Sequence, residues 1–212
     1  MSSEQLSPAP QGSLDEKSLH SDPVEQFRAW LSEAIAAEIH EPWASALGTA
    51  TPEGLPSVRF VLLRGFDSRG FVFYTNYGSR KALELEANPH GALAFYWHEL
   101  GRQVRVEGTV ERTSAEESDA YFDSRPFGNR LSAIASPQSR VLASRAELEQ
   151  AVRELMGRYR HAGEGVPRPA TWGGYRLVHE AIEFWQHGPH RLHDRLRYAR
   201  RGAGWIVDRL AP

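Results

Sequence analysis

The hydrophobic residues between positions 23 and 40 recur every three or four residues, which is the spacing of one face of an α-helix. Asp22 is a favourable N-cap residue, and Pro23 suits the first helical position because its missing N–H would have no partner there. The apolar positions on this face are Phe27, Trp30, Leu31, Ile35 and Ile39. We therefore predict a helix over 23–40.

Further along, short apolar runs are bounded by turn residues such as those at 52–54, a pattern typical of β-strands. Ser79 and Ser144 are candidate N-caps for helices over 79–88 and 144–161, and Ser114 forms a capping box with Glu117. The predicted strands cover 44–51, 57–63, 70–75, 91–97, 103–112, 174–184 and 204–209. Since strands and helices do not alternate regularly, the pattern predicts an α+β domain on an antiparallel sheet or barrel.

The first 21 residues differ from the rest of the chain, because they contain six serines and only five apolar residues. So few apolar side chains cannot offset the entropy lost on ordering the segment. The sequence therefore predicts a flexible N-terminal tail over 1–21 and one domain over 22–212, a size within the usual range for a single domain.

Charge and composition exclude several classes of protein. The formal net charge of the 212 residues is −2, so no overall basic field would attract nucleic acid. The absence of cysteine excludes disulfides, thiolate metal sites and cysteine nucleophiles, and is compatible with a reducing compartment. No run approaches the ~20 apolar residues of a membrane span, and no signal-peptide pattern begins the chain. We expect a cytoplasmic protein with neither nucleic acid nor membrane as a partner.

Familiar nucleotide-binding, hydrolase and metalloprotease motifs are missing, but cations cluster in three places. In the first, strand alternation puts Arg59 and Arg64 on opposite faces. They are either solvated strand-end charges or ligands of two different anions, since guanidinium binds phosphate well.

The second cluster, at 74–81, runs from a strand through a turn into the start of a helix. Arg80 and Lys81 would lie in the first helical turn, where the helix dipole disfavours cations. An ordinary capped helix is the simpler interpretation, but free amides, hydroxyls and cations together favour a phosphate site. Lys81 is one of only two lysines in the chain.

The third cluster lies at 183–195 and is rich in histidine and arginine. A metal site is not expected, because Gly188-Pro189 would break a helix that aligned the histidines and no further ligand is evident. RNA contact is another possible role, although no RNA-binding module is recognisable. On a strand, Arg191, His193 and Arg195 would face one way, which suits an anionic substrate that exchanges a proton.

Several blocks in order resemble the FMN-dependent pyridoxine/pyridoxamine 5′-phosphate oxidases. They are R-F-V-L-L-R (59–64), F-Y-T-N-Y-G-S-R-K (73–81), Y-F-D-S-R-P (121–126), Q-S-R (138–140), W-G-G-Y-R (172–176) and E-F-W-Q-H-G-P-H-R-L-H-D-R (183–195). The resemblance implies an FMN-binding split β-barrel, antiparallel and Greek-key-like, with peripheral helices. It also implies a homodimer with FMN between the chains, and oxidation of pyridoxine or pyridoxamine 5′-phosphate to pyridoxal 5′-phosphate with O₂, giving H₂O₂.

The same resemblance assigns roles to individual residues. Those implied to contact FMN are Arg59, Phe60, Val61, Leu62, Leu63, Arg64, Tyr74, Thr75, Arg80, Lys81, Gln103, Gln138, Ser139, Trp185 and Arg195. Those implied to bind the substrate are Arg64, Tyr121, Arg125, Asn129, Arg191, Leu192 and His193, with Arg191 and His193 as the catalytic pair. No metal is implied.

Two positions depart from the family pattern, which usually has lysine in place of Arg64 and serine in place of Asn129. Arginine still binds phosphate, and asparagine keeps a hydrogen-bond donor on a larger side chain. Two alternatives therefore stay open. One is a flavin oxidase of the same fold that acts on another aromatic compound, as in phenazine biosynthesis, and the other is a non-catalytic flavin- or pyridoxal-phosphate-binding protein.

Overall fold

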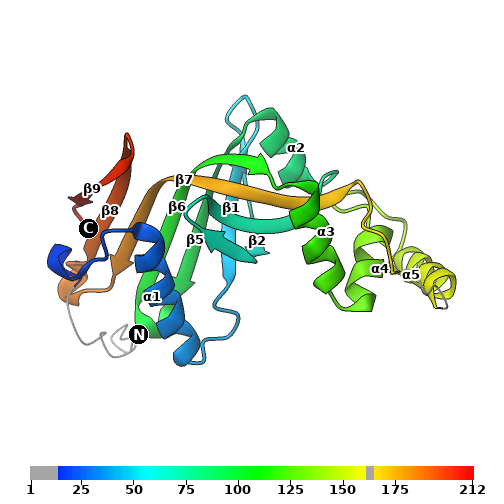
Figure 1. Ribbon diagram of the computed structural model, residues 1–212, viewed down its shortest axis with the longest axis horizontal. Helices are drawn as coiled ribbons and strands as arrows, with labels where there is room; N and C mark the ends of the chain where they lie inside the picture. Colours follow the sequence, from blue (N-terminus) through cyan, green and yellow to red (C-terminus); the bar gives the residue numbers. More distant parts are fainter. Residues whose placement is uncertain (1–13, 161–164) are drawn as a thin grey trace, which may run out of the picture.

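A computed structural model describes residues 14–160 and 165–212, shown in Figure 1. An antiparallel sheet dominates it, and helices pack around the sheet (Figure 1). The strands are β1 (Ala44–Ala50), β2 (Pro56–Leu62), β3 (Gly65–Asp67), β4 (Gly70–Asn76), β5 (His90–Trp97), β6 (Arg102–Arg112), β7 (Trp172–Gln186), β8 (Asp194–Arg201) and β9 (Gly204–Arg209). The helices are α1 (Pro23–Ala36), α2 (Arg80–Ala87), α3 (Ala115–Ser124), α4 (Phe127–Ala135) and α5 (Arg145–Tyr159).

The strand order is β2-β1-β5-β6-β7-β4-β3, and β8 adds to β7 and carries β9. The long strand β7 is the centre of this arrangement, since it pairs with β4, β6 and β8 along its length. A register shift between Glu107 and Gly108 bends the β6–β7 pair, as β-bulges do. The α+β class and the antiparallel sheet predicted from the sequence are confirmed, and the curled sheet with its helices is a split barrel.

The main hydrophobic core lies between α1 and the sheet. Phe27 on α1 is fully buried, and its ring lies about 5 Å from the rings of Phe66, Phe71 and Phe95. Such edge-to-face and tilted contacts suit aromatic side chains and add to the gain from burying them. Asp22 caps this helix as predicted, because its side chain accepts a hydrogen bond from the Val24 N–H.

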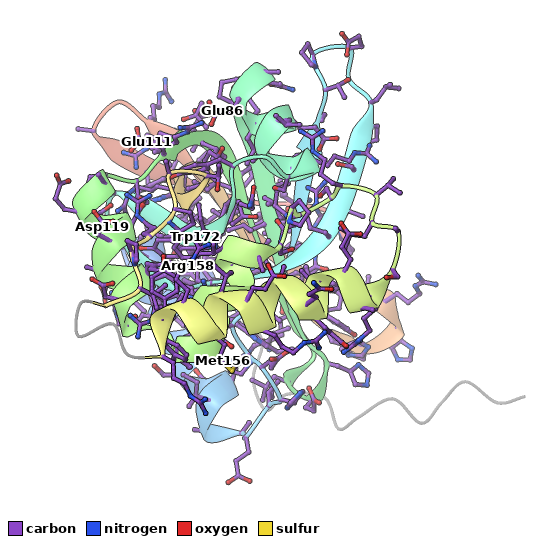
Figure 2. The ribbon with its side chains drawn as sticks, turned by 90° about the vertical axis from the view of Figure 1, so that its right-hand side faces the viewer. Glu86, Glu111, Asp119, Met156, Arg158 and Trp172 are labelled. Atoms are coloured by element: carbon purple, nitrogen blue, oxygen red, sulfur yellow. The ribbon has the colours of Figure 1, made fainter. Side chains whose placement is uncertain are left out.

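A second, smaller core joins α3 and α4 to the start of β7, and its buried residues are Phe122, Leu131, Val166 and Trp172. Figure 2 looks onto this end of the molecule and shows α5 lying across it, with Met156 and Arg158 on that helix and Trp172 behind. This second core holds α3 and α4 beside the end of the sheet.

The structure corrects the predicted tail. Leu14 is buried, its N–H donates to Asp194 at 3.1 Å, and Glu16 lies in a short 3₁₀ turn and pairs with Arg209 at 2.7 Å. A flexible tail is therefore wrong for residues 14–21, which are ordered by contacts with distant strands. Residues 1–13 of the predicted tail lie outside the described residues.

Smaller corrections concern elements with weak local patterns. The first helix ends at Ala36 rather than at 40, because the chain turns at Glu38, whose φ is 54°. Strands β3 and β8 and helix α4 were not predicted as such; β8 is strongly charged and is defined by pairing with β7 and β9. In the ranges 14–160 and 165–212, no helix is long and apolar enough to cross a membrane.

Candidate functional site

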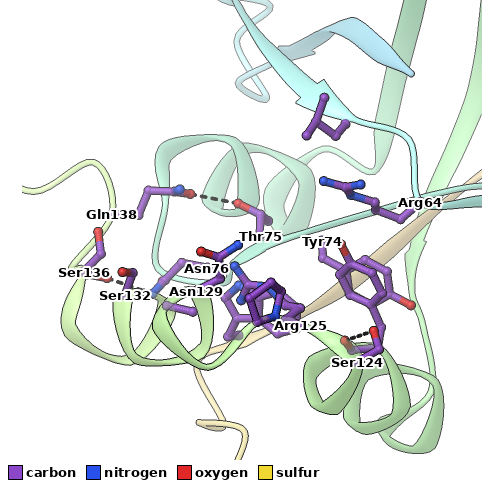
Figure 3. A pocket seen from close by; sticks show the side chains of 15 residues that line it. Arg64, Tyr74, Thr75, Asn76, Ser124, Arg125, Asn129, Ser132, Ser136 and Gln138 are labelled. Atoms are coloured by element: carbon purple, nitrogen blue, oxygen red, sulfur yellow. Dashed lines mark hydrogen bonds between the residues drawn. The ribbon is translucent and has the colours of Figure 1, made fainter. Parts of the chain in front are cut away.

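A cavity of about 690 Å³ opens beside α3 and α4, at the end of β2 and along β4 (Figure 3). It brings together eight of the predicted site residues, namely Leu62, Arg64, Tyr74, Thr75, Tyr121, Arg125, Asn129 and Gln138. The remaining lining comprises Asn76, Ser124, Pro126, Ser132, Ala133, Ser136 and Trp172. Residues predicted for substrate and for cofactor thus share one cavity.

Two arginines give this cavity a positive wall. Arg125 stacks over Trp172, with its Cζ atom 4.7 Å from the ring centroid, and its Nη1 atom is buried without a hydrogen-bond partner. Burial lowers the pKa of Arg125, Tyr121 opposes that effect, and nearby Arg64 adds to it. Within the described ranges, neither Arg64 nor Arg125 forms an ion pair with a carboxylate. Two unpaired guanidinium groups facing one cavity are suited to an anionic ligand.

Aromatic rings form the adjoining wall of the cavity. The ring of Tyr74 lies 4.0 Å from that of Tyr121 and 5.4 Å from that of Trp172, and the three planes are nearly parallel. Gly174 makes this packing possible, since a Cβ atom there would lie 2.8 Å from Cε1 of Tyr74 and 2.5 Å from Oγ1 of Thr113. The wall offers a flat apolar surface next to the two cations.

Lys81 forms a buried polar cluster at the start of α2. Its Nζ atom donates to Oε1 of Gln138 at 2.9 Å and to Oγ1 of Thr75 at 3.2 Å. Burial, reinforced by the nearby charge of Arg59, lowers the pKa of Lys81 to about 8. A buried ammonium group held by neutral oxygens and repelled by an arginine is stabilised by a bound anion.

Glu84 balances part of the charge next to this cluster. Its carboxylate lies 2.8 Å from Nε of Arg80 and 3.3 Å from Nη2 of Arg59. Burial raises the pKa of Glu84, but hydrogen bonds from Ser57, Thr49 and Arg80 outweigh burial and bring it to about 2. Arg59 is therefore held by a carboxylate, unlike Arg64, and Ser139 joins the cluster by accepting a hydrogen bond from the Arg80 N–H at 3.2 Å.

The rest of the first cluster divides between surface and core. Phe60 is 76% exposed, Val61 is half-buried, and Leu63 is in the main core. Phe60 and the neighbouring Val58 leave an exposed apolar surface on the edge strand β2.

A second set of predicted residues lies elsewhere. Gln103 on β6, Trp185 on β7 and Arg195 on β8 are direct cross-strand neighbours. Nε of Arg195 donates to Glu183 at 2.8 Å, and the His193 ring lies 4.6 Å from that of Trp185. The prediction that Arg191, His193 and Arg195 alternate on a strand is wrong, because β8 begins at Asp194 and Arg191 lies in the 3₁₀ turn Pro189–Arg191 with a φ of 65°.

The two sets of predicted residues lie at opposite ends of the long strand β7. Trp172, in the cavity, and Trp185, beside His193, are the two ends of β7, about 13 residues and roughly 40 Å apart along the strand at ~3.3 Å per residue. Figure 1 shows the same separation, with α3 and α4 at one end of the molecule and the β7–β8 connection at the other. One copy of the chain therefore does not bring the two sets together in one cavity.

Sequence reasoning missed several lining residues. Asn76 and Trp172 lie within motifs that were singled out, and the available signal was a nearby glycine, Gly78 in the turn after Asn76 and Gly173 beside Trp172 in β7. Ser132 and Ser136 line the cavity from α4 and the residue after it, and no local pattern predicted that helix.

Comparison with known proteins identifies the family. Residues 31–158 match the family model described as pyridoxamine 5′-phosphate oxidase, and residues 172–212 match one described as the pyridoxine 5′-phosphate oxidase C-terminal dimerisation region. The chain belongs to the pyridoxamine 5′-phosphate oxidase family. The family resemblance predicted from the sequence is confirmed.

Individual relatives give the same picture. A pyridoxine/pyridoxamine 5′-phosphate oxidase from Rubrobacter xylanophilus is 59% identical over 199 residues, covering 94% of this chain and 91% of the relative. One from Paraburkholderia phymatum is 56% identical over 202 residues, covering 95% and 94%. These relatives support an oxidoreductase.

Solved structures share the fold. PhzG from Burkholderia lata 383, in complex with tetrahydrophenazine-1-carboxylic acid, has a TM-score of 0.90 and 33% identity, covering 97% of this chain and all of that one. A pyridoxamine 5′-phosphate oxidase-related, FMN-binding protein from Nostoc punctiforme has a TM-score of 0.72 at 16% identity, which supports the fold alone. A solved structure at 33% identity therefore shares the fold but carries a different name from the relatives above.

Proposed function

We propose that this chain is an FMN-dependent oxidase that converts pyridoxine 5′-phosphate and pyridoxamine 5′-phosphate to pyridoxal 5′-phosphate, with O₂ as acceptor and H₂O₂ as product. With the amine substrate, the reaction also consumes water and releases ammonia. The observation that carries the proposal is the pair of unpaired arginines, Arg64 and Arg125, in a cavity walled by aromatic rings. A phosphorylated pyridine matches both features, because its phosphate suits the guanidinium groups and its ring suits the flat wall.

The Lys81 cluster fits the phosphate of FMN. Lys81 is buried without a carboxylate partner among the described residues, and Thr75, Ser79 and Gln138 surround its ammonium group with hydroxyl and amide oxygens. In the proposal, Arg59, Arg80 and Lys81 supply the positive charge, and Glu84 fixes the positions of the two arginines. A bound flavin would supply the redox chemistry, while the protein supplies binding and orientation.

The chain's own groups would then position the substrate. Arg64 and Arg125 would hold the substrate phosphate, with Tyr121 and Asn129 beside them. Fixing the phosphate at one end of the substrate orients its reacting carbon, and orientation of this kind contributes much of an enzyme's rate enhancement. Arg191, Leu192 and His193 would complete the site from the other side of the pyridine ring.

The proposal requires two copies of the chain. Since the His193 set lies roughly 40 Å along β7 from the cavity, a second copy would have to bring its Gln103, Trp185, Arg191, His193 and Arg195 to the cavity of the first. The match of 172–212 to a dimerisation region supports a homodimer, and this region contains most of that set. A cytoplasmic location is part of the proposal, and the cysteine-free composition is compatible with it.

A phenazine-type activity is the second candidate, because PhzG shares the fold at a TM-score of 0.90 and its structure contains a tricyclic carboxylic acid. A carboxylate carries one negative charge and a phosphate up to two. Two unpaired guanidinium groups therefore favour the phosphate.

The deciding experiment is to purify the protein with FMN, record its visible spectrum, and follow pyridoxal 5′-phosphate and H₂O₂ formation from pyridoxine 5′-phosphate in air. Equal amounts of both products are expected. Turnover of tetrahydrophenazine-1-carboxylic acid in place of pyridoxine 5′-phosphate would favour the second candidate. Flavin binding without turnover of either compound would indicate a non-catalytic flavin-binding protein.

Mixing two impaired variants, assayed at a low substrate concentration where each alone has little activity, tests the shared site. Arg125→Ala would damage one half of each site and His193→Ala the other half. A mixed dimer contains one site with both halves intact, so the mixture should recover up to about a quarter of wild-type activity, as expected if half of the dimers are mixed and each has one working site of two. No recovery on mixing, despite proven subunit exchange, would contradict a site formed by two chains.

A further inference from the structure

The loop that connects β7 and β8 folds back so that its backbone contacts the His193 ring. The Gly188 N–H donates a hydrogen bond to Nδ1 of His193 at 3.2 Å. The loop is tight, because a Cβ atom on Gly188 would lie 2.0 Å from the Leu192 carbonyl oxygen, and both His190 and Arg191 have positive φ angles. Strained backbone of this kind persists where the surrounding structure fixes it, often at functional sites.

This hydrogen bond determines where His193 carries its proton. A backbone N–H can only donate, so Nδ1 must be the accepting, unprotonated nitrogen. A neutral imidazole has one N–H, which is therefore at Nε2. Protonation of the ring would put a second N–H at Nδ1, facing the Gly188 N–H, and would break the hydrogen bond.

The charges around His193 also oppose protonation. The ring of His187 lies 5.3 Å from that of His193. The backbone N–H of His187 donates a hydrogen bond to the Gly101 carbonyl oxygen at 2.8 Å, which fixes the position of His187. Burial lowers the pKa of His193, and the nearby His187 and Arg191 lower it further.

Neighbouring groups on β7 and β8 do not offset this effect. The carboxylate of Asp194 points to Arg209 at 2.6 Å and to the Leu14 N–H at 3.1 Å, and Glu183 pairs with Arg195 at 2.8 Å. The Trp185 ring also contacts the His193 ring, and it carries no charge. No carboxylate among the described residues pairs with the His193 ring.

We propose that the Gly188 amide and His187 together hold His193 neutral with its proton on Nε2, so that His193 serves the substrate as a hydrogen-bond donor and not as a proton-accepting base. His187 is then a positioning residue that acts through His193. The statement about substrate rests on the proposed oxidase function, with an oxygen atom of the bound pyridine compound as the acceptor. The protonation state of His193 does not depend on that function.

Nitrogen NMR of the ¹⁵N-histidine-labelled, FMN-loaded protein tests the protonation state without any turnover. The His193 signals would be assigned by their loss in His193→Gln. At neutral pH we expect an unprotonated Nδ1, a protonated Nε2, and a pKa below the ordinary value of about 6.5. A proton on Nδ1, or a pKa at or above that value, would overturn the proposal.

A His187→Phe variant tests the positioning role, because phenylalanine keeps a ring next to Trp185 but cannot carry charge. The pKa of His193 should rise toward about 6.5 in this variant. His90→Phe, a change at an exposed histidine on β5, should leave it where it is in the wild type. Equal behaviour of the two variants would remove His187 from the proposal.

Two amide substitutions test the donor role. The glutamine amide in His193→Gln reaches the position of Nε2 and can donate there, whereas the shorter asparagine in His193→Asn reaches only the position of Nδ1. We expect kcat/KM for pyridoxine 5′-phosphate to be about tenfold higher in His193→Gln than in His193→Asn, which is the equivalent of one hydrogen bond. Equal losses in both, with wild-type kcat falling as His193 becomes protonated, would identify a base and contradict the proposal.

These measurements also separate the two proposals. If the NMR result is as expected and no variant or wild-type protein oxidises pyridoxine 5′-phosphate, the proposed function fails while the protonation state stands. If the oxidase is active and His193 titrates at its ordinary pKa, the proposed protonation state fails while the proposed function stands.

Discussion

The Nζ atom of Lys81 lies 2.9 Å from Oε1 of Gln138, a residue 57 positions further along the chain. The same oxygen accepts a hydrogen bond from the Thr75 hydroxyl at 2.8 Å. The contact ties the start of α2 to the segment after α4 and leaves Lys81 with neutral partners. A buried ammonium group that has no carboxylate partner is the clearest sign of an anion site in this cluster.

Removing this charge should weaken FMN binding. We expect Lys81→Met to raise the Kd for FMN by about 10- to 100-fold, because a charge-assisted hydrogen bond contributes ~1.5–3 kcal/mol. Titration of the flavin-free protein followed by flavin fluorescence measures the Kd. The matched control is Lys17→Met, which removes the other, exposed lysine at the far end of the chain and should leave the Kd unchanged.

The same lysine should make FMN binding depend on pH. Its pKa of about 8 in the flavin-free protein means that Lys81 loses its proton as the pH rises through that value. FMN affinity should therefore fall between about pH 8 and 10 in the wild type and much less in Lys81→Met. Parallel pH profiles for the two proteins would count against Lys81 as a phosphate ligand.

Arg125 should act on the phosphate of the substrate alone. We expect Arg125→Met to raise KM for pyridoxine 5′-phosphate by about 10- to 100-fold, and to change the weak turnover of unphosphorylated pyridoxine little, because the lost interaction is with the phosphate. Steady-state kinetics with both substrates measure this. Arg153→Met on the exposed side of α5 is the control and should behave as the wild type. An equal effect on both substrates would assign Arg125 to another part of the ligand.

Arg176, which is buried, should contribute more to the free energy of unfolding than the exposed Arg69 does. Its guanidinium is buried and joins Asp67 at 3.2 Å to Glu117 at 2.9 Å, which anchors the first turn of α3, the helix that carries Tyr121. We expect Arg176→Met to lower the free energy of unfolding by ~2–4 kcal/mol, as for a broken buried ion pair. Arg69→Met removes an exposed arginine from the same two carboxylates and should change it by less than ~1 kcal/mol. Urea denaturation compares the two.

His179 should make the fold sensitive to acid. It is buried against Trp205 with its Nδ1 atom unpartnered, and burial, with a smaller effect of Arg200, lowers its pKa to about 4. Between the unfolded value of about 6.5 and about 4, the unfolded chain takes up this proton and the folded protein does not. The free energy of unfolding should therefore fall with decreasing pH in that window, by at most about 1.4 kcal/mol per pH unit from this residue.

A His179→Phe variant isolates that contribution, since phenylalanine can stack on Trp205 without titrating. Its stability should decline less steeply than that of the wild type between pH 6.5 and 4, whereas His90→Phe at an exposed site should follow the wild type. The same slope in all three proteins would mean that other groups control the acid response.

The local patterns of the sequence were sufficient for most of the secondary structure. The caps at Asp22, Ser114 and Ser144 all accept the expected backbone hydrogen bonds, because an N-cap depends only on residues two or three positions away. Strand alternation likewise located most strands to within one or two residues. Where the pattern was weak, as in β8 and α4, pairing with distant elements decided the structure.

The site was predictable as a set of residue types but not as an arrangement. Sequence alone indicated that cations at 59–64, 80–81, 125 and 191–195 were candidates for anion binding. It could not indicate that Glu84 pairs with Arg59 while Arg64 and Arg125 have no carboxylate partner among the described residues, or that the Gly188 N–H fixes the tautomer of His193. It also gave no sign that Leu14 and Glu16 pack against β8 and β9.

The sequence by itself determined the local elements, because each depends on residues that are close together in the chain. It also determined the family and the α+β class, because these depend on the order of motifs and elements along the chain and not on their contacts. The tertiary structure decided which charges are free, since that depends on the register of strands far apart in sequence. It also placed the two sets of predicted site residues at opposite ends of β7, where the length of one strand keeps them apart within a single chain.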